Sequence, residues 1–215
     1  MESTAALPVV RLKPKADPRA IRRGAPWVFA DELVLDRRSR ALPPGSIARL
    51  EDAERGPLGV VAVNPLSKIV ARMLDPDPEA VIDQAWLAAR LTRALALRAR
   101  LHDAPFYRLV HAEGDGLPGL VIDRFGDAAA MQPNAAWADR LAGEIAAALQ
   151  QVAGLATVVL NGTGRARVLE GLTEETRLLA GTLAGPVPVP MNGATYMADL
   201  LGGQKTGLYY DQRDN

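Results

Sequence analysis

The sequence predicts an α+β fold in three parts: a small N-terminal β-barrel over residues 1–75, a central α/β domain over 76–185, and a C-terminal β-hairpin over 186–215. Short alternating apolar runs separated by proline and glycine fill the first part, which is typical of small barrels. Beyond it, apolar strand patterns alternate with longer helical patterns, which is typical of an α/β domain. A chain of 215 residues has room for two small domains, each with a core of its own.

The barrel is expected to consist of short strands that end at turn residues. These strands cover residues 9–13, 46–51, 58–63 and 68–74. Asp17 and Pro18 suit the N-cap and the first position of a short helix, which should end at Gly24. Residues 11–40 hold 9 basic and 4 acidic side chains, an excess that suits either a phosphate-binding face or an ordinary solvated surface.

The central part is expected to open with a long helix. Asp77 suits its N-cap and Pro78 its first position, and the helical pattern continues to about residue 101. Three arginines share one side of this helix: Arg90, Arg93 and Arg100. They could contact RNA, but a solvated helix face is the simpler interpretation.

Further strands and a second helix should follow. The strands are predicted at residues 107–112, 120–123, 128–132 and 157–161. The helix lies between the last two of them, with Asn134 as its N-cap and apolar residues at spacings of three and four. Near the C-terminus, Asn192 and Gly193 predict the two-residue turn of a hairpin, and the alternating prolines before it predict a linker or an edge strand.

The residues themselves form no motif of catalysis or metal binding. The segment 203–207 is not a P-loop, because Gln204 and Asp199 stand where that motif needs glycine. Three acidic residues lie near tight turns, where carboxylates usually bond the backbone: Glu113, Asp115 and Asp123. Three other charged residues could pair with one another or with a neighbouring domain: Arg165, Arg167 and Glu170. The absence of cysteine excludes a thiolate ligand or a cysteine nucleophile within these residues.

Composition favours a globular protein of the cytoplasm. The hydrophobic fraction is 48%, the charged fraction is 23%, and basic and acidic residues balance at 25 each. No apolar run is long enough for a membrane span, and the first residues lack the basic start and apolar core of a signal peptide. We therefore expect no membrane partner.

Three groups of residues occur together in this chain. They are GAPWVF at 24–29 with VNPLS at 63–67, YRLVHAEGDGLPGLVID at 107–123, and DLLGGQKTG at 199–207 with DQR at 211–213. In this combination the chain resembles the PUA-domain-containing class I ribosomal RNA methyltransferases, the bacterial family that forms 5-methylcytosine in large-subunit rRNA. The resemblance covers nearly the whole chain. It implies a PUA barrel, a central α/β domain, and a hairpin that leads into a Rossmann-like domain that binds S-adenosylmethionine.

The resemblance also implies roles for particular residues. Seven of them would line the cleft for the cofactor and the target base: Gln204, Lys205, Thr206, Gly207, Asp211, Gln212 and Arg213. Five would contact RNA: Arg19, Arg22, Arg23, Trp27 and Lys205. Two alternatives stay open, since Asp211 and Arg213 could form an interdomain salt bridge and Trp27 could belong to the core.

The chain departs from the family pattern after residue 213. The glycine-rich cofactor motif and the catalytic cysteine of the family would follow Asn215, so we expect the Rossmann-like domain to be missing and these residues alone to be inactive. The implied partner is ribosomal RNA rather than DNA, and a homodimer is plausible from the resemblance. The alternative hypothesis is a stand-alone RNA-binding module without enzymatic activity.

Overall fold

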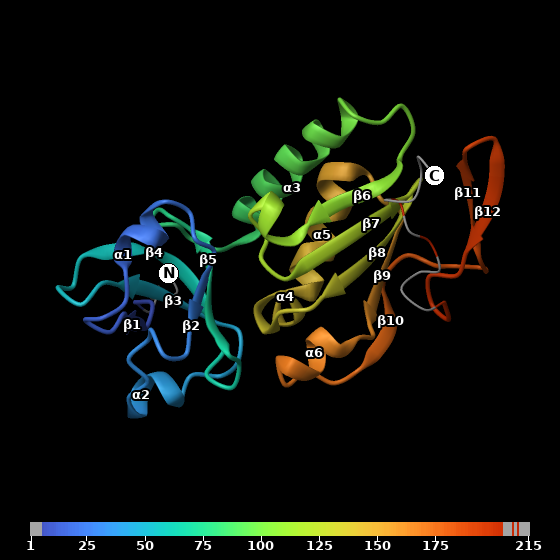
Figure 1. The fold of residues 1–215 in the computed structure, drawn as a ribbon. Coiled ribbons are helices and arrows are strands. Elements are labelled where there is room, and N and C mark those ends of the chain that lie inside the picture. Colours follow the sequence, from blue (N-terminus) through green and yellow to red (C-terminus); the bar gives the residue numbers. More distant parts are fainter. Residues whose placement is uncertain (1–5, 204–207, 209, 211–215) are drawn as a thin grey trace, which may run out of the picture. The chain divides into compact units, whose positions relative to one another are not determined.

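The structure, a computed structural model, describes residues 6–203, 208 and 210 (Figure 1). The chain divides into two compact units, unit 1 over residues 1–82 and unit 2 over residues 83–215. Each unit has a five-stranded sheet of its own, and unit 2 carries an additional two-stranded hairpin. Within the described part of the chain, no helix is long and apolar enough to cross a membrane.

Unit 1 contains a sheet in the order β1-β3-β4-β5-β2. Its strands are β1 (Val9–Arg11), β2 (Trp27–Phe29), β3 (Ser46–Glu51), β4 (Pro57–Val63) and β5 (Ile69–Asp75). Strand β1 pairs parallel with β3, and the other pairs are antiparallel. Beyond the two edge strands, Leu12 and Leu33 form an antiparallel bridge, and the N–H of Val34 donates to the carbonyl of Arg11 over 2.8 Å. This bridge links the segments that follow the two edge strands, as expected for a small barrel.

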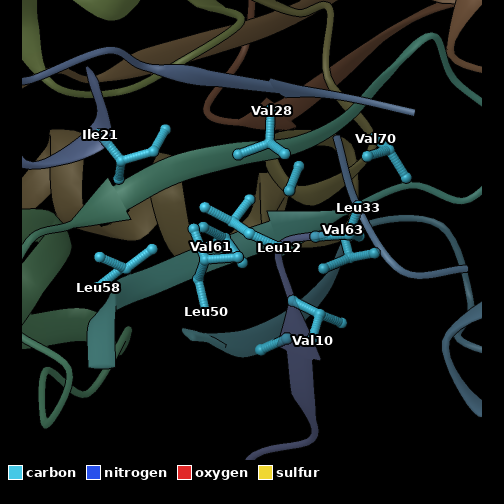
Figure 2. Packing of buried hydrophobic residues seen from close by; sticks show 12 residues of the cluster. Val10, Leu12, Ile21, Val28, Leu33, Leu50, Leu58, Val61, Val63 and Val70 are labelled. Atoms are coloured by element: carbon cyan, nitrogen blue, oxygen red, sulfur yellow. The ribbon is translucent and has the colours of Figure 1, made fainter. Parts of the chain in front are cut away.

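The core of unit 1 consists of aliphatic side chains that alternate with outward-facing ones. Figure 2 shows Val28, Leu50 and Val61 from three different strands pointing into the same cluster, which also receives Leu33. Each of these four side chains is at most 1% exposed. Burial of one such side chain contributes about 1.5–3 kcal/mol, so the unit has a hydrophobic core of its own.

Unit 1 also contains two short helices, α1 (Pro18–Arg22) and α2 (Arg37–Arg40). The predicted cap of α1 is confirmed, because the carboxylate of Asp17 accepts the N–H of Arg19 over 2.9 Å. Helix α2 was not predicted, although Asp36 caps it in the same way, accepting the N–H groups of Arg38 and Ser39.

The first long helix, α3 (Gln84–Ala99), begins six residues later than predicted. Its N-cap is Asp83, whose carboxylate accepts the N–H of Trp86 over 2.9 Å. Asp77 accepts the N–H of Glu79 but closes only a local turn. Val81 and Ile82, which follow that turn, are β-branched and disfavour helix, whereas the alanines and leucines after Asp83 favour it.

Unit 2 contains a sheet in the order β10-β9-β8-β7-β6. The strands are β6 (Phe106–His111), β7 (Leu120–Phe125), β8 (Ala128–Pro133), β9 (Thr157–Gly162) and β10 (Glu175–Ala180). Only the β8–β9 pair is parallel among these, and helices α4 (Ala136–Arg140) and α5 (Ala142–Ala153) form its crossover. Helices α3 and α5 pack against each other beside the sheet (Figure 1). Four of the five strands were predicted, and β10 and the short helix α6 (Arg165–Leu169) were not.

The second predicted helix is two helices that meet at Leu141. The prediction of Asn134 as its N-cap is wrong, because α4 starts after Ala135 and has no side-chain cap. Asn134 instead continues the strand pairing, and its N–H donates to the carbonyl of Gly119 over 2.8 Å. The local sequence favours Asn134 as an N-cap, but its backbone bond to Gly119, 15 positions away, keeps it in the strand pairing.

The predicted hairpin is confirmed as β11 (Val187–Met191) and β12 (Ala194–Ala198). Asn192 and Gly193 between them have φ of 54° and 74°, which fits a type I′ turn. Strand β11 pairs only with β12 in the described part, so it is the edge strand that its prolines allow. Val189 and Ala198 of the hairpin are buried in a cluster with Phe125 of the main sheet.

Candidate functional site

The short helix α1 and its C-cap contain three arginines for which RNA contact is predicted: Arg19, Arg22 and Arg23. Arg22 is already engaged, because its Nη2 lies 2.7 Å from Oδ2 of Asp52. Arg23 lies 3.7 Å from the exposed carboxylate of Asp17, a separation at which a surface ion pair contributes little. Arg19 is exposed, and its side chain has no partner among the described residues. The helix thus offers two available cations, Arg19 and Arg23, and one that is held in place.

Asp52 is the residue that holds Arg22. Its Oδ1 accepts the N–H of Gly56 over 2.6 Å, and this bond lowers the pKa of Asp52, with a further contribution from the Arg22 guanidinium. The lowered pKa favours the ionised carboxylate, which holds the Arg22 guanidinium in place through the 2.7 Å contact. Nothing in the sequence pattern indicated this pair, because the two residues are 30 positions apart.

Trp27 and Phe29 form an exposed aromatic pair on strand β2. Their side chains are 40% and 44% exposed, and their ring centroids lie 6.4 Å apart at an interplanar angle of 84°. Val28 between them is 1% exposed and points into the core. The interpretation of Trp27 as a core residue is therefore wrong, because strand alternation places Val28 inside. Exposed aromatic rings of this kind stack on unpaired nucleobases.

The seven residues predicted to line the cofactor cleft lie outside the described residues. These are Gln204, Lys205, Thr206, Gly207, Asp211, Gln212 and Arg213, and Lys205 is also the fifth predicted RNA contact. The chain before them makes a tight turn at Asp199, whose Oδ1 accepts the N–H groups of Leu201 and Gly202. A Cβ atom on Gly203 would lie 2.4 Å from the carbonyl oxygen of Asp199, so only glycine fits there.

Tyr210 anchors the chain near this segment. Its hydroxyl donates to the carbonyl of Arg124 over 2.8 Å, and its ring packs against Phe125 with centroids 5.6 Å apart. Leu200, within the turn that begins at Asp199, is fully buried in the same cluster as Phe125. The described residues on either side of 204–207 therefore contact the sheet of unit 2.

Two of the predicted acidic turn residues form ion pairs within unit 2. Both oxygens of Asp115 accept from Arg98, over 2.5 and 2.7 Å, and Oδ2 also accepts the N–H of His111. Asp123 lies in strand β7 rather than in a turn, and its two oxygens accept from Arg108 over 3.0 and 3.2 Å. These contacts support a structural role. Among the described residues, no group of three or more histidine or acidic side chains could hold a metal ion.

Arg167, one of the three charged residues expected to form ion pairs, is buried in unit 2. It is 1% exposed, and its guanidinium donates to the carboxylate of Asp139 and to the carbonyls of Pro133 and Thr173. Glu170, which was suggested as one of its possible partners, accepts the N–H of Ala136 through Oε2 over 3.4 Å. Arg167 thereby links α6 to the end of β8 and to α4, which precede it in the chain, and to Thr173, which follows it.

Comparison with known proteins agrees with the architecture of unit 1. Residues 10–76 match the family model of the PUA-like domain. The N-terminal unit is a PUA-like domain. The whole chain also aligns with a solved structure, a candidate SAM-dependent methyltransferase from Streptococcus mutans, with a TM-score of 0.77 at 19% identity, over 97% of this chain and 52% of that one. A second solved structure, described as a methyltransferase in complex with SAH, aligns with a TM-score of 0.76.

Curated relatives match the chain across both units. Ribosomal RNA large subunit methyltransferase I of Alteromonas mediterranea is 35% identical over 209 residues, which is 96% of this chain and 52% of the relative. Ribosomal RNA large subunit methyltransferase of Deinococcus radiodurans is 33% identical over 219 residues, 97% of this chain and 53% of the relative. The chain spans about half the length of the curated relatives it matches. The fold is thus α+β, with a PUA-like N-terminal domain and methyltransferases as its structural neighbours.

Proposed function

We propose that this protein is the RNA-binding and substrate-positioning part of an S-adenosylmethionine-dependent methyltransferase that forms 5-methylcytosine in large-subunit rRNA. The observation that carries the proposal is the extent of the similarity. Relatives named as ribosomal RNA large subunit methyltransferases match 96–97% of the chain, so the likeness is not confined to the PUA-like unit. We expect the proposed methylation of ribosomal RNA to take place in the cytoplasm.

The surface of unit 1 supports RNA binding. Arg19 and Arg23 are available for phosphate on α1, and Trp27 and Phe29 offer exposed rings for a base. Phosphate contacts supply affinity without sequence preference, and stacking adds energy for an unpaired base. These two features occur in the same unit, which is a PUA-like domain.

The chemistry of the proposed reaction needs a residue that these 215 positions do not contain. Methylation at C5 of cytosine requires a thiolate that adds to C6 and makes C5 nucleophilic. The sequence has no cysteine, so we expect no methyl transfer by these residues alone. Their part in the reaction would be to bind RNA and to orient the target.

Cofactor binding by this chain stays a prediction for residues 204–207 and 211–213. Among the described residues beside this segment, Asp199 uses its Oδ1 within its own turn, where it accepts the N–H groups of Leu201 and Gly202. Most of the cleft that the resemblance implies would lie in the Rossmann-like domain, which we expect to be missing. We therefore expect calorimetry with S-adenosylmethionine to show weak or no binding. Tight binding would contradict this division of roles.

RNA binding tests the proposal directly. A labelled fragment of large-subunit rRNA should bind the chain with an affinity that falls as salt rises, as phosphate contacts require. Absence of binding at low salt would refute the proposal. A second candidate function is that of a non-enzymatic RNA-binding module, which the separate hydrophobic core of unit 1 favours. In that case RNA would bind, but the native protein would have no methyltransferase activity.

The proposal includes a homodimer, which the resemblance makes plausible. Sedimentation at twice the mass of the monomer would support it.

A further inference from the structure

Helix α3 of unit 2 and its C-cap include two arginines whose guanidinium groups form no hydrogen bond or ion pair with a described residue. The helix and its C-cap contain four arginines and no acidic residue: Arg90, Arg93, Arg98 and Arg100. The guanidinium of Arg90 lies over the ring of Trp86, 5.1 Å from its centroid. Arg98 forms the paired bonds to Asp115 described above. Arg93 and Arg100 are exposed, and neither has a side-chain partner in the described ranges 6–203, 208 and 210.

These two arginines line a groove between α3 and the 3-10 turn η1 (Ala112–Asp115), which we call the α3 groove. It has a volume of about 330 Å³. Its lining residues are Arg93, Ala94, Ala96, Leu97, Arg100, Gly114 and Asp115. Leu97 is 47% exposed, so the groove offers apolar surface between its two cations. Gly114 has no side chain to fill the opposite wall.

The charge of the α3 groove is positive. Among its described lining residues, Asp115 carries the single carboxylate, and its side chain is only 7% exposed. Both of its oxygens are bound to Arg98, so its charge is compensated within the protein. Arg93 and Arg100 are not compensated, and the groove therefore favours an anionic ligand.

The spacing of the two arginines favours an extended ligand. Arg93 and Arg100 are seven positions apart in the chain, so they lie on the same side of the helix and about 10 Å apart along its axis. Each guanidinium can bind one phosphate through two N–H donors. Contact with a single small anion would use only one of them, whereas a nucleic-acid strand presents phosphates in succession.

We propose that the α3 groove binds a segment of single-stranded RNA, with Arg93 and Arg100 on separate phosphates and Leu97 against the sugar or base between them. The inference rests on the proposed function, since it takes the same class of ligand. It adds a second RNA contact surface, in unit 2, to the arginines and aromatic pair of the PUA-like unit. An acidic polypeptide is the other polyanion that could pair with two arginines, and the experiment includes it.

The test compares two double variants of the full chain. Arg93→Gln/Arg100→Gln removes both cations of the groove, and Arg140→Gln/Arg165→Gln removes two exposed arginines elsewhere in unit 2 that also lack partners among the described residues. Binding of a short labelled single-stranded RNA is followed by fluorescence anisotropy over a series of salt concentrations. Each lost phosphate contact lowers the slope of log K against log salt by about 0.7. The groove variant should lose about 1.4 from that slope, and the control variant should match the wild type.

The outcomes separate this inference from the proposed function. Wild-type binding with an unchanged slope in the groove variant would overturn the groove and leave the proposed function standing. Failure of the wild type to bind any RNA would overturn both. Poly-glutamate that binds the wild type but not the groove variant, with RNA binding equal in the two, would assign the groove to an acidic polypeptide and also overturn the inference. Equal thermal unfolding of the variants and the wild type verifies that the substitutions act on the surface alone.

Discussion

Removal of the buried guanidinium of Arg167 should destabilise unit 2 far more than removal of its exposed neighbour Arg165 on the same helix. Arg167 donates to one carboxylate and two backbone carbonyls. Arg167→Ala leaves those carbonyl oxygens without their donor and Asp139 without its cation. Loss of one partner of a buried ion pair costs about 3–5 kcal/mol. Since unfolding of a unit of this size shifts by about 4 °C per kcal/mol, the melting temperature should fall by about 12–20 °C.

Tryptophan fluorescence can report on unit 2 alone. Trp86 and Trp137 belong to unit 2, and Trp137 is 1% exposed, so its emission should change on unfolding. The substitutions are therefore made in a Trp27→Phe background, which removes the tryptophan of unit 1. Urea unfolding should then give a lower midpoint for Arg167→Ala and a midpoint near the parent for Arg165→Ala. Equal midpoints for the two variants would refute the assignment of Arg167 as a buried tie.

Three further predictions concern the other unit and the hairpin. Asp52 has a lowered pKa in the folded protein, chiefly because it accepts the N–H of Gly56. Its carboxylate therefore stabilises the fold above its unfolded pKa, and this contribution is lost as pH falls through the folded pKa. In Asp52→Asn the free energy of unfolding should thus fall less steeply below about pH 4, as measured by urea unfolding at several pH values. Gly193→Ala, at φ of 74°, should cost about 1 kcal/mol, whereas Gly185→Ala should cost less, and calorimetry compares them. Trp27→Ala should weaken RNA binding by about 1–3 kcal/mol in an anisotropy assay, and unchanged binding would remove the aromatic pair from the RNA surface.

The sequence predicts best those elements whose signals are local. The strands β3, β4 and β5 follow from short apolar runs bounded by proline and glycine turns, and the structure places them within one residue of the prediction. The α1 cap and the Asn192–Gly193 turn depend on the conformational preferences of two residues each. In all of these cases the deciding interactions lie within a few positions of one another.

The errors arise where a distant residue decides. Asn134 has the right chemistry for an N-cap, but its N–H bonds to Gly119 on the neighbouring strand segment. Trp27, Val28 and Phe29 are all apolar, so alternation predicts two faces without indicating which is inside. The pairing of β2 with β5 settles the question by placing Val28 opposite the buried Ala71. None of these partners can be identified from the local pattern.

Arginine count is a poor guide to the proposed RNA-binding surface, because the partners of each guanidinium decide whether it is available to a ligand. The strongest basic excess in the sequence lies at residues 11–40, yet Arg22 within it is bound to Asp52. The arginines of α3 looked like a solvated row, yet the structure separates Arg98, which neutralises Asp115, from Arg93 and Arg100, which remain available beside a groove. A chain with balanced total charge can bind a polyanion only where such compensation is locally absent. Arginines available to a ligand occur in both units, Arg19 and Arg23 in unit 1 and Arg93 and Arg100 in unit 2. The salt dependence of RNA binding, measured on variants of each pair, therefore tests the two surfaces separately.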